Sequence, residues 1–162
     1  MIGRTGWLAC MGVLFSAHAW AQERTVSTFG DWSVRCEAGP PRNCETAVTL
    51  SNAEGRAVAQ LVIGRLNSQG PLLAMAHVPL NVHLPGQVRL AIEGAPLALA
   101  FQRCVPQGCF AMVEVDEALL RRLRAEPAGA RLLFQDATRQ EVGLAVSLRG
   151  FARAQAALST QR

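Results

Sequence analysis

Short stretches in which apolar and polar residues alternate account for much of the chain. In residues 31–36, Trp32, Val34 and Cys36 fall on one face of an extended chain, and polar residues fall on the other. Residues 87–93 repeat this pattern. Because successive side chains of a strand point to opposite faces, a period of two predicts strands with one buried face.

Turn residues separate the other stretches of strand-like composition, which are residues 45–51, 57–63, 97–104, 109–115, 131–135 and 141–148. Residues 72–78 are apolar and ambiguous, and Pro79 and Pro85 make the next segment an edge strand or irregular. Many short strands with tight turns predict a mainly β fold. We expect an antiparallel β-sandwich or barrel-like single domain with one or two short helices.

One helix is predicted after Asp116, which is a good N-cap residue. Its apolar face consists of Leu119, Leu120 and Leu123. Pro127 and Gly129 end it. A second short helix is predicted at residues 150–158.

The first 21 residues have the organisation of an export signal. Arg4 provides a positive start, residues 6–15 are apolar, and the small-x-small sequence Ala19-Trp20-Ala21 suits a signal peptidase. We predict cleavage after Ala21, which leaves one domain of residues 22–162 in the periplasm or outside the cell. An uncleaved anchor is disfavoured because the second half of the segment is too polar to span a membrane.

Four cysteines remain after cleavage, and an even number in an exported chain predicts two disulfides with three possible pairings. The spacing favours Cys36–Cys44 and Cys104–Cys109, the second pair flanking a predicted turn. The spacing does not fit a four-cysteine zinc site. The redox motif Cys-x-x-Cys is also missing from the sequence.

The charge balance of the mature chain is mildly basic. All sixteen basic residues of the chain are arginine, and fifteen of them with twelve acidic residues give the mature part a formal net charge of +3. No long basic run or aromatic-interleaved basic patch occurs in the sequence. We therefore do not expect nucleic-acid binding.

Few residues suggest chemistry. His77 and His83 are the only histidines after cleavage, and no acidic residue or cysteine near them in sequence completes a metal site. No nucleophile–base pair or cofactor motif stands out, so we predict no catalytic residue, metal or cofactor. The best candidate binding patch is Arg121, Arg122 and Arg124, which could contact lipid head groups or acidic glycans. Stabilisation of the C-terminal end of the helix is the stronger explanation for these cations.

Several motifs occur in an order that resembles the invasion-associated locus B family of exported bacterial proteins. They include Phe29-Gly30-Asp31-Trp32-Ser33-Val34-Arg35-Cys36, residues 78–88, Phe101-Gln102-Arg103-Cys104 with Gly108-Cys109, Phe134-Gln135-Asp136 and Val146-Ser147-Leu148-Arg149-Gly150-Phe151. The resemblance covers nearly all of the mature chain. What carries over by residue is the cysteine framework and the strand that contains Trp32.

The resemblance implies a function without catalysis. The family is named for a role in host-cell invasion, and no catalytic residues define it. We expect an exported protein that binds an unknown component of the cell envelope or of a host surface. The alternatives are an envelope enzyme that uses His77 or His83, and a structural or chaperone-like periplasmic domain.

The export prediction is tested by the N-terminus of the exported protein. Mass spectrometry should find Gln22 as its first residue, because the small residues Ala19 and Ala21 define the cleavage site. A full-length product embedded in the membrane would contradict cleavage.

Overall fold

The computed structural model describes residues 25–38, 43–67, 69–92, 96–125 and 129–160. The predicted signal peptide, residues 1–21, and the predicted mature start at Gln22 lie outside the described residues, as does the predicted helix-ending residue Pro127.

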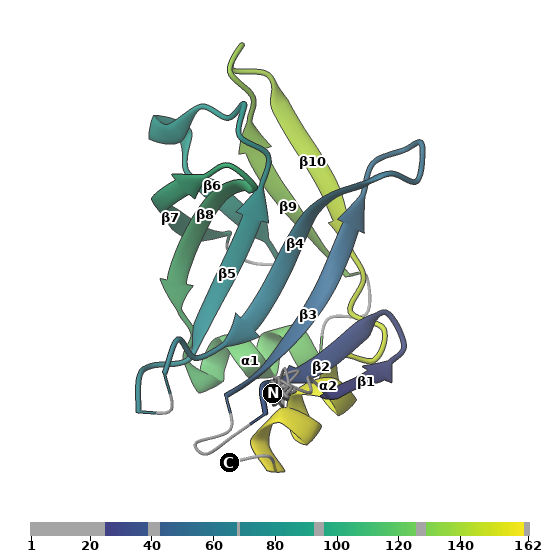
Figure 1. Ribbon diagram of the computed structural model, residues 1–162. Coiled ribbons are helices and arrows are strands. Elements are labelled where there is room, and N and C mark those ends of the chain that lie inside the picture. The colour runs from purple at the N-terminus through teal and green to yellow at the C-terminus, as the bar shows by residue number, and fades with distance from the viewer. Residues whose placement is uncertain (1–24, 39–42, 68, 93–95, 126–128, 161–162) are drawn as a thin grey trace, which may run out of the picture.

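The fold is one antiparallel sheet that curls on itself (Figure 1). Its strands are β1 (Thr25–Phe29), β2 (Trp32–Cys36), β3 (Cys44–Ser51), β4 (Ala57–Gly64), β5 (Leu73–Val78), β6 (Val88–Ala91), β7 (Leu97–Val105), β8 (Gly108–Glu114), β9 (Ala130–Gln135) and β10 (Glu141–Val146). They are arranged in the order β1-β2-β3-β4-β5-β8-β7-β6-β9-β10. The last strand, β10, lies against β3 without joining its ladder, so the sheet is nearly closed. The predicted mainly β, barrel-like single domain is confirmed.

Alternating burial explains how the sheet encloses a core. On β2, Trp32, Val34 and Cys36 are buried while the residues between them are partly exposed, as the period of two predicts. On β6, Val88 and Leu90 point inward in the same way. The largest fully buried side chains come from strands throughout the sheet and from both helices; they include Trp32, Leu50, Leu61, Ile63, Leu90, Leu99, Leu123, Leu132 and Phe151.

Two helices lie at one end of the curled sheet, at the bottom of Figure 1. Helix α1 (Glu117–Ala125) begins where the Asp116 carboxylate accepts a hydrogen bond of 2.7 Å from the Leu119 backbone N–H. Its three leucines are buried, as predicted. Helix α2 (Phe151–Thr160) packs on β1, β2 and β3 and contacts α1. Neither helix, nor any other helix in the described residues, is long and apolar enough to cross a membrane.

Three segments needed the structure to be assigned. Strand β1 is not apparent from hydrophobic alternation, because most of its side chains are exposed and its position depends on pairing with β2. The ambiguous apolar stretch is strand β5, which pairs with β4 and β8. The proline-interrupted segment is mostly irregular, with a single bridge from Val82 to Asp136 and a short 3-10 helix, η1 (Leu84–Gly86).

The structure joins Cys36 to Cys44 and Cys104 to Cys109, the two pairs that the spacing favours. Both bridges connect residues that face each other on neighbouring antiparallel strands, β2 with β3 and β7 with β8. The Cα atoms are 4.1 Å and 4.0 Å apart. Each bridge therefore fastens a local strand pair and not two distant parts of the chain.

Removing either bridge should destabilise the domain. We expect the variants Cys36→Ala/Cys44→Ala and Cys104→Ala/Cys109→Ala each to lose about 2–5 kcal/mol of unfolding free energy, because their unfolded chains are less restricted. Urea unfolding measures this loss. Non-reducing peptide mapping of the unmodified protein is the control, and a peptide joining Cys36 to Cys104 or Cys109 would contradict the pairing.

Candidate functional site

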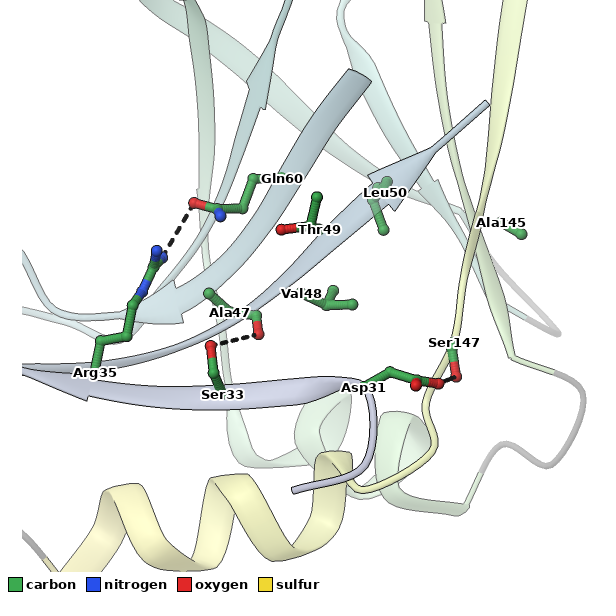
Figure 2. Close-up of a pocket in the computed structure, with 10 residues that line it drawn as sticks. All are labelled: Asp31, Ser33, Arg35, Ala47, Val48, Thr49, Leu50, Gln60, Ala145 and Ser147. Atoms are coloured by element: carbon green, nitrogen blue, oxygen red, sulfur yellow. Dashed lines mark hydrogen bonds between the residues drawn. The ribbon is translucent and has the colours of Figure 1, made fainter. Parts of the chain in front are cut away.

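A polar pocket of about 360 Å³ opens where strand β10 approaches β3 (Figure 2). Strand β2 pairs with β3 only as far as the Ser33–Ala47 pair, so the next part of β3 has no strand partner on that side among the residues that the structure describes. Strand β10 comes against this unpaired part. We call the space the β3–β10 pocket; its lining is Asp31, Ser33, Arg35, Ala47, Val48, Thr49, Leu50, Gln60, Ala145 and Ser147.

Arg35 is the cationic side chain of this pocket, and its charge is already compensated. Its guanidinium donates to Gln60 Oε1 at 3.1 Å (Figure 2). It also forms an ion pair with Glu45 at 3.0 Å. Its Nε atom is buried and has no hydrogen-bond partner within the described residues. Nearby, Ser33 Oγ donates to the Ala47 carbonyl at 3.4 Å. The lining thus offers hydroxyl, amide and guanidinium groups at one opening.

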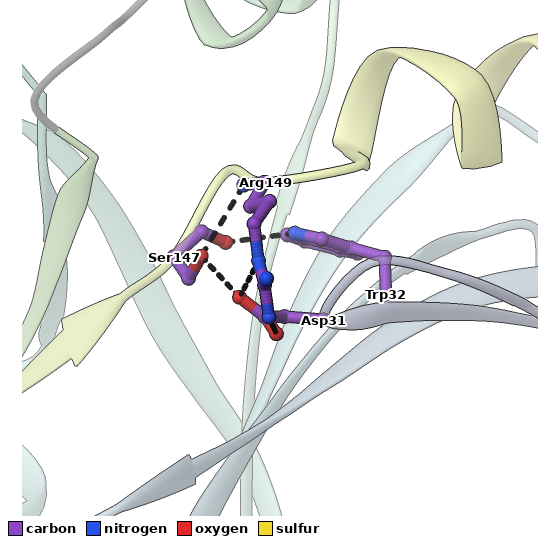
Figure 3. Close-up of polar contacts among 4 residues, drawn as sticks. All are labelled: Asp31, Trp32, Ser147 and Arg149. Carbon is purple, nitrogen blue, oxygen red and sulfur yellow. Dashed lines mark hydrogen bonds and ion pairs between the residues drawn. The ribbon is translucent and has the colours of Figure 1, made fainter.

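Asp31 lies at one end of the pocket and is held by two residues from the far end of the chain (Figure 3). Arg149 donates to its two carboxylate oxygens, at 2.5 Å to Oδ1 and 3.1 Å to Oδ2, and Ser147 Oγ donates to Oδ2 at 2.6 Å. The bonds from Arg149 first, and then from Ser147, lower the pKa of Asp31 to about 2. Asp31 is therefore ionised near neutral pH.

The backbone around this network leaves no room for larger residues. The Asp31 backbone N–H donates to the Arg149 carbonyl at 3.0 Å, and Trp32 Nε1 donates to the Ser147 carbonyl at 2.8 Å. A Cβ atom on Gly150 would lie 1.8 Å from the Phe29 carbonyl oxygen, so only glycine fits there. We call Asp31, Ser147 and Arg149, with these backbone contacts, the Asp31 network.

The side chains that line the β3–β10 pocket are not arranged as a general base near neutral pH. A general base near neutral pH needs a pKa close to that range, and Asp31 is far below it. The Ser147 hydroxyl donates to this carboxylate, and none of the pocket's lining residues is a histidine that could activate it. The described residues contain no group of three histidine, cysteine or acidic side chains that could hold a metal ion.

The two candidate histidines have different surroundings. His77, on β5, stacks on Phe110 of β8 with ring centroids 4.6 Å apart, and its Nε2 lies 3.0 Å from the Gln107 carbonyl oxygen. His83 precedes η1, and its backbone N–H donates to the Gln135 carbonyl at 2.9 Å. Neither histidine lines the β3–β10 pocket.

The three arginines of the predicted binding patch lie on the second half of α1. Arg124 donates to Glu117 Oε1 at 2.9 Å and to Gln155 Oε1 of α2 at 2.7 Å, so it connects the two helices. Arg121 and Arg122 are exposed on the second half of α1. The electrostatic binding hypothesis is therefore tested at Arg121 and Arg122, whose replacement leaves this connection between the helices intact.

Sequence reasoning alone did not find the Asp31 network. Asp31 is 116 residues from Ser147 and 118 from Arg149, and nothing in one sequence pairs these positions. The sequence contained only an indirect signal. Asp31 lies in one of the short motifs that carry the family resemblance, and Ser147 and Arg149 lie in another. The structure shows that the two motifs are in contact.

Comparisons with known proteins agree with that resemblance. The family model described as Invasion associated locus B (IalB) protein matches residues 32–159. The crystal structure of invasion associated protein B from Bartonella henselae matches with a TM-score of 0.71 and 25% sequence identity, covering 84% of this chain and 95% of that chain. None of the curated proteins matches.

The Asp31 network predicts a specific pH dependence. The folded pKa of Asp31 is lowered to about 2 from an ordinary value of 3.8, so its contribution is present above about pH 4 and is lost as the pH falls towards 2. We expect Asp31→Asn to unfold at lower urea concentration than the wild type at pH 7. This difference should shrink between about pH 4 and pH 2.

The matched control is Glu54→Gln, which alters an exposed carboxylate whose ion pair with Arg56 is 3.8 Å long. It should leave the urea midpoint nearly unchanged at pH 7. Equal stability of Asp31→Asn and the wild type at pH 7, or an undiminished difference at pH 2, would contradict the role of the network.

Proposed function

The chain belongs to the invasion associated locus B family, and from this premise we propose that it is an exported protein that acts by binding in the cell envelope or at a host surface, without catalysis. The family places it among invasion-associated proteins. Export, the binding role and the absence of an activity are the steps that the proposal adds.

One observation carries the preference for binding. The two charged side chains that line the β3–β10 pocket already have partners. Asp31 is bonded to Arg149 and Ser147, and Arg35 is bonded to Glu45 and Gln60. Groups held in this way give a surface a fixed shape and a fixed pattern of charge. This supports recognition of a partner by a rigid scaffold, with function placed on exposed faces and loops.

The exposed arginines of α1 support binding by electrostatic attraction to an anionic surface. Arg121 and Arg122 are exposed at the end of the molecule formed by the helices (Figure 1). Arg124 is left unchanged in the test because its guanidinium holds Glu117 and Gln155 and connects the two helices. An arginine close to an anionic membrane surface contributes about 1 kcal/mol to binding, so two such residues together account for roughly a 30-fold change in affinity.

The proposal predicts that the double variant Arg121→Gln/Arg122→Gln associates more weakly with envelope and host-cell membranes than the wild type, by about 10- to 30-fold. Added salt should weaken the wild type more than the variant, because it screens exposed charges. Cosedimentation of the mature protein with vesicles containing anionic phospholipid, and with isolated membranes, measures both effects.

The charge-matched control is Arg56→Gln/Arg139→Gln, which removes two exposed arginines from the β3–β4 and β9–β10 turns at the opposite end of the molecule (Figure 1). It should bind like the wild type. Unchanged association of the Arg121→Gln/Arg122→Gln variant would refute the basic-surface form of the proposal. A hydrolytic or transfer activity that is lost in folded His77→Ala or His83→Ala variants would overturn the binding function itself.

A further inference from the structure

Part of one edge of strand β7 is not covered by any strand of the described residues. On one side, β7 pairs with β8 from Ala100 to Val105. On the other side, β6 pairs with β7 only from Leu97 to Leu99. From Ala100 onward, the backbone on the side away from β8 has no strand partner within the described residues. Unpaired N–H and C=O groups in a row are a template for another strand.

A groove of about 500 Å³ runs along this edge. One wall is formed by the β7 residues Ala100 to Cys104, and the other wall comes from the segment that contains η1. We call this space the β7 groove; its lining is Leu84, Pro85, Gln87, Ala100, Phe101, Gln102, Arg103 and Cys104. Leu84 is 49% exposed, although it is a large apolar residue. Within this segment the Gln102 side-chain amide donates to the Ala100 carbonyl at 3.2 Å, a bond that an added strand would replace. The groove therefore combines an edge without a strand partner with apolar contact surface.

The wall opposite β7 has a fixed position. The His83 backbone N–H bonds to the Gln135 carbonyl, and a Cβ atom on Gly86 would lie 2.8 Å from the Gln135 side-chain oxygen. Gln87 has a φ of 54°, a left-handed conformation that is uncommon outside glycine. A strained residue in a segment held by such contacts is typical of functional sites. The groove thus has a preformed width.

The β7 side of the groove is also ordered before anything binds. The Cys104–Cys109 disulfide fastens β7 to β8, and a bulge lies between Phe101 and Arg103. The Arg103 guanidinium lies 5.8 Å from the Phe110 ring centroid, and no carboxylate among the described residues pairs with it. An exposed arginine without an acidic partner favours a ligand that brings a carboxylate.

We propose that the β7 groove binds an extended peptide segment of a partner protein, which adds to the sheet as a strand beside Ala100–Cys104. Backbone hydrogen bonds would supply affinity, and alternate side chains would supply specificity. Apolar side chains of the peptide would contact Leu84 and Phe101, and an acidic one would pair with Arg103. This inference goes beyond the proposed function, because it concerns a different face and needs no membrane.

The test uses the isotopically labelled mature protein and two capped six-residue peptides of alternating valine and threonine with one central glutamate. One peptide has free backbone N–H groups, and the other is N-methylated at alternate positions, which removes strand hydrogen bonds. We expect the free peptide to shift and protect the backbone amides of Ala100–Val105, as measured by NMR and hydrogen exchange. The N-methylated peptide should bind at least tenfold more weakly.

Two exposed leucines give a matched pair of variants. Leu84→Glu places a carboxylate in the groove beside Arg103 and removes an apolar contact, so it should weaken peptide binding by tenfold or more. Leu80→Glu changes a residue that is 54% exposed but does not line the groove, and it should have no effect. Arg103→Gln should weaken binding of the glutamate peptide about tenfold, the loss of one charge-assisted contact.

Any one of four results would overturn the inference. The first is no binding at ~1 mM peptide, a concentration at which a binding free energy of only about 4 kcal/mol would still be detected. The second is protection of amides away from β7, and the third is equal binding of the two peptides. Self-association that Leu84→Glu abolishes would also overturn it and would assign the groove to a second copy of the chain. Because no membrane is present, failure here leaves the outcome of the membrane experiment unaffected.

Discussion

The contact between Asp31 and Arg149 joins the start of the sheet to the connection that follows its last strand. Strands β1 and β10 are at opposite ends of the hydrogen-bonded order, so nothing in the ladder itself brings them together. The side chains of this ion pair are exposed, and exposed ion pairs contribute little by their charge alone. Its importance is geometric, because the same few residues also provide the backbone bond to Arg149 and the bond from Trp32 to Ser147.

Apolar packing supports the same junction from inside. The Trp32 and Phe151 rings are fully buried with centroids 4.8 Å apart, so the first strand of the core and the start of the last helix share one contact. Burying two large aromatic side chains is a much larger favourable term than an exposed ion pair. Gly30 and Gly150 allow the two backbones to approach closely enough for both sets of contacts. The curled sheet, and with it the β3–β10 pocket, depends on this junction.

The elements that could be predicted from the sequence are those decided by nearby residues. The buried face of β2 follows from alternation, the start of α1 follows from the Asp116 cap, and both cysteine pairs follow from short spacing. What could not be predicted depends on distant partners. Strand β5 pairs with β8, although β6 and β7 come between them in the sequence, and β6 lies between β7 and β9 in the sheet. Asp31 and Arg149 are ordinary surface residue types until the folded chain brings them together, which is why the candidate site required the structure.

An antiparallel sheet that does not close completely leaves unpaired backbone N–H and C=O groups at its edges. The edges of this sheet differ in length and in what lies against them. Strand β10 lies against β3, and β1 has only five residues. The β7 edge carries a bulge and the cation Arg103, features that discourage the flat edges of two sheets from joining. A bulge twists the edge locally, and a rigid sheet cannot follow that twist along its length. A single flexible peptide can follow it, because each of its residues adjusts separately. The features that discourage edge-to-edge pairing at β7 are therefore compatible with peptide binding there. Leu84 and Pro85 line the groove beside this edge and would contact such a peptide.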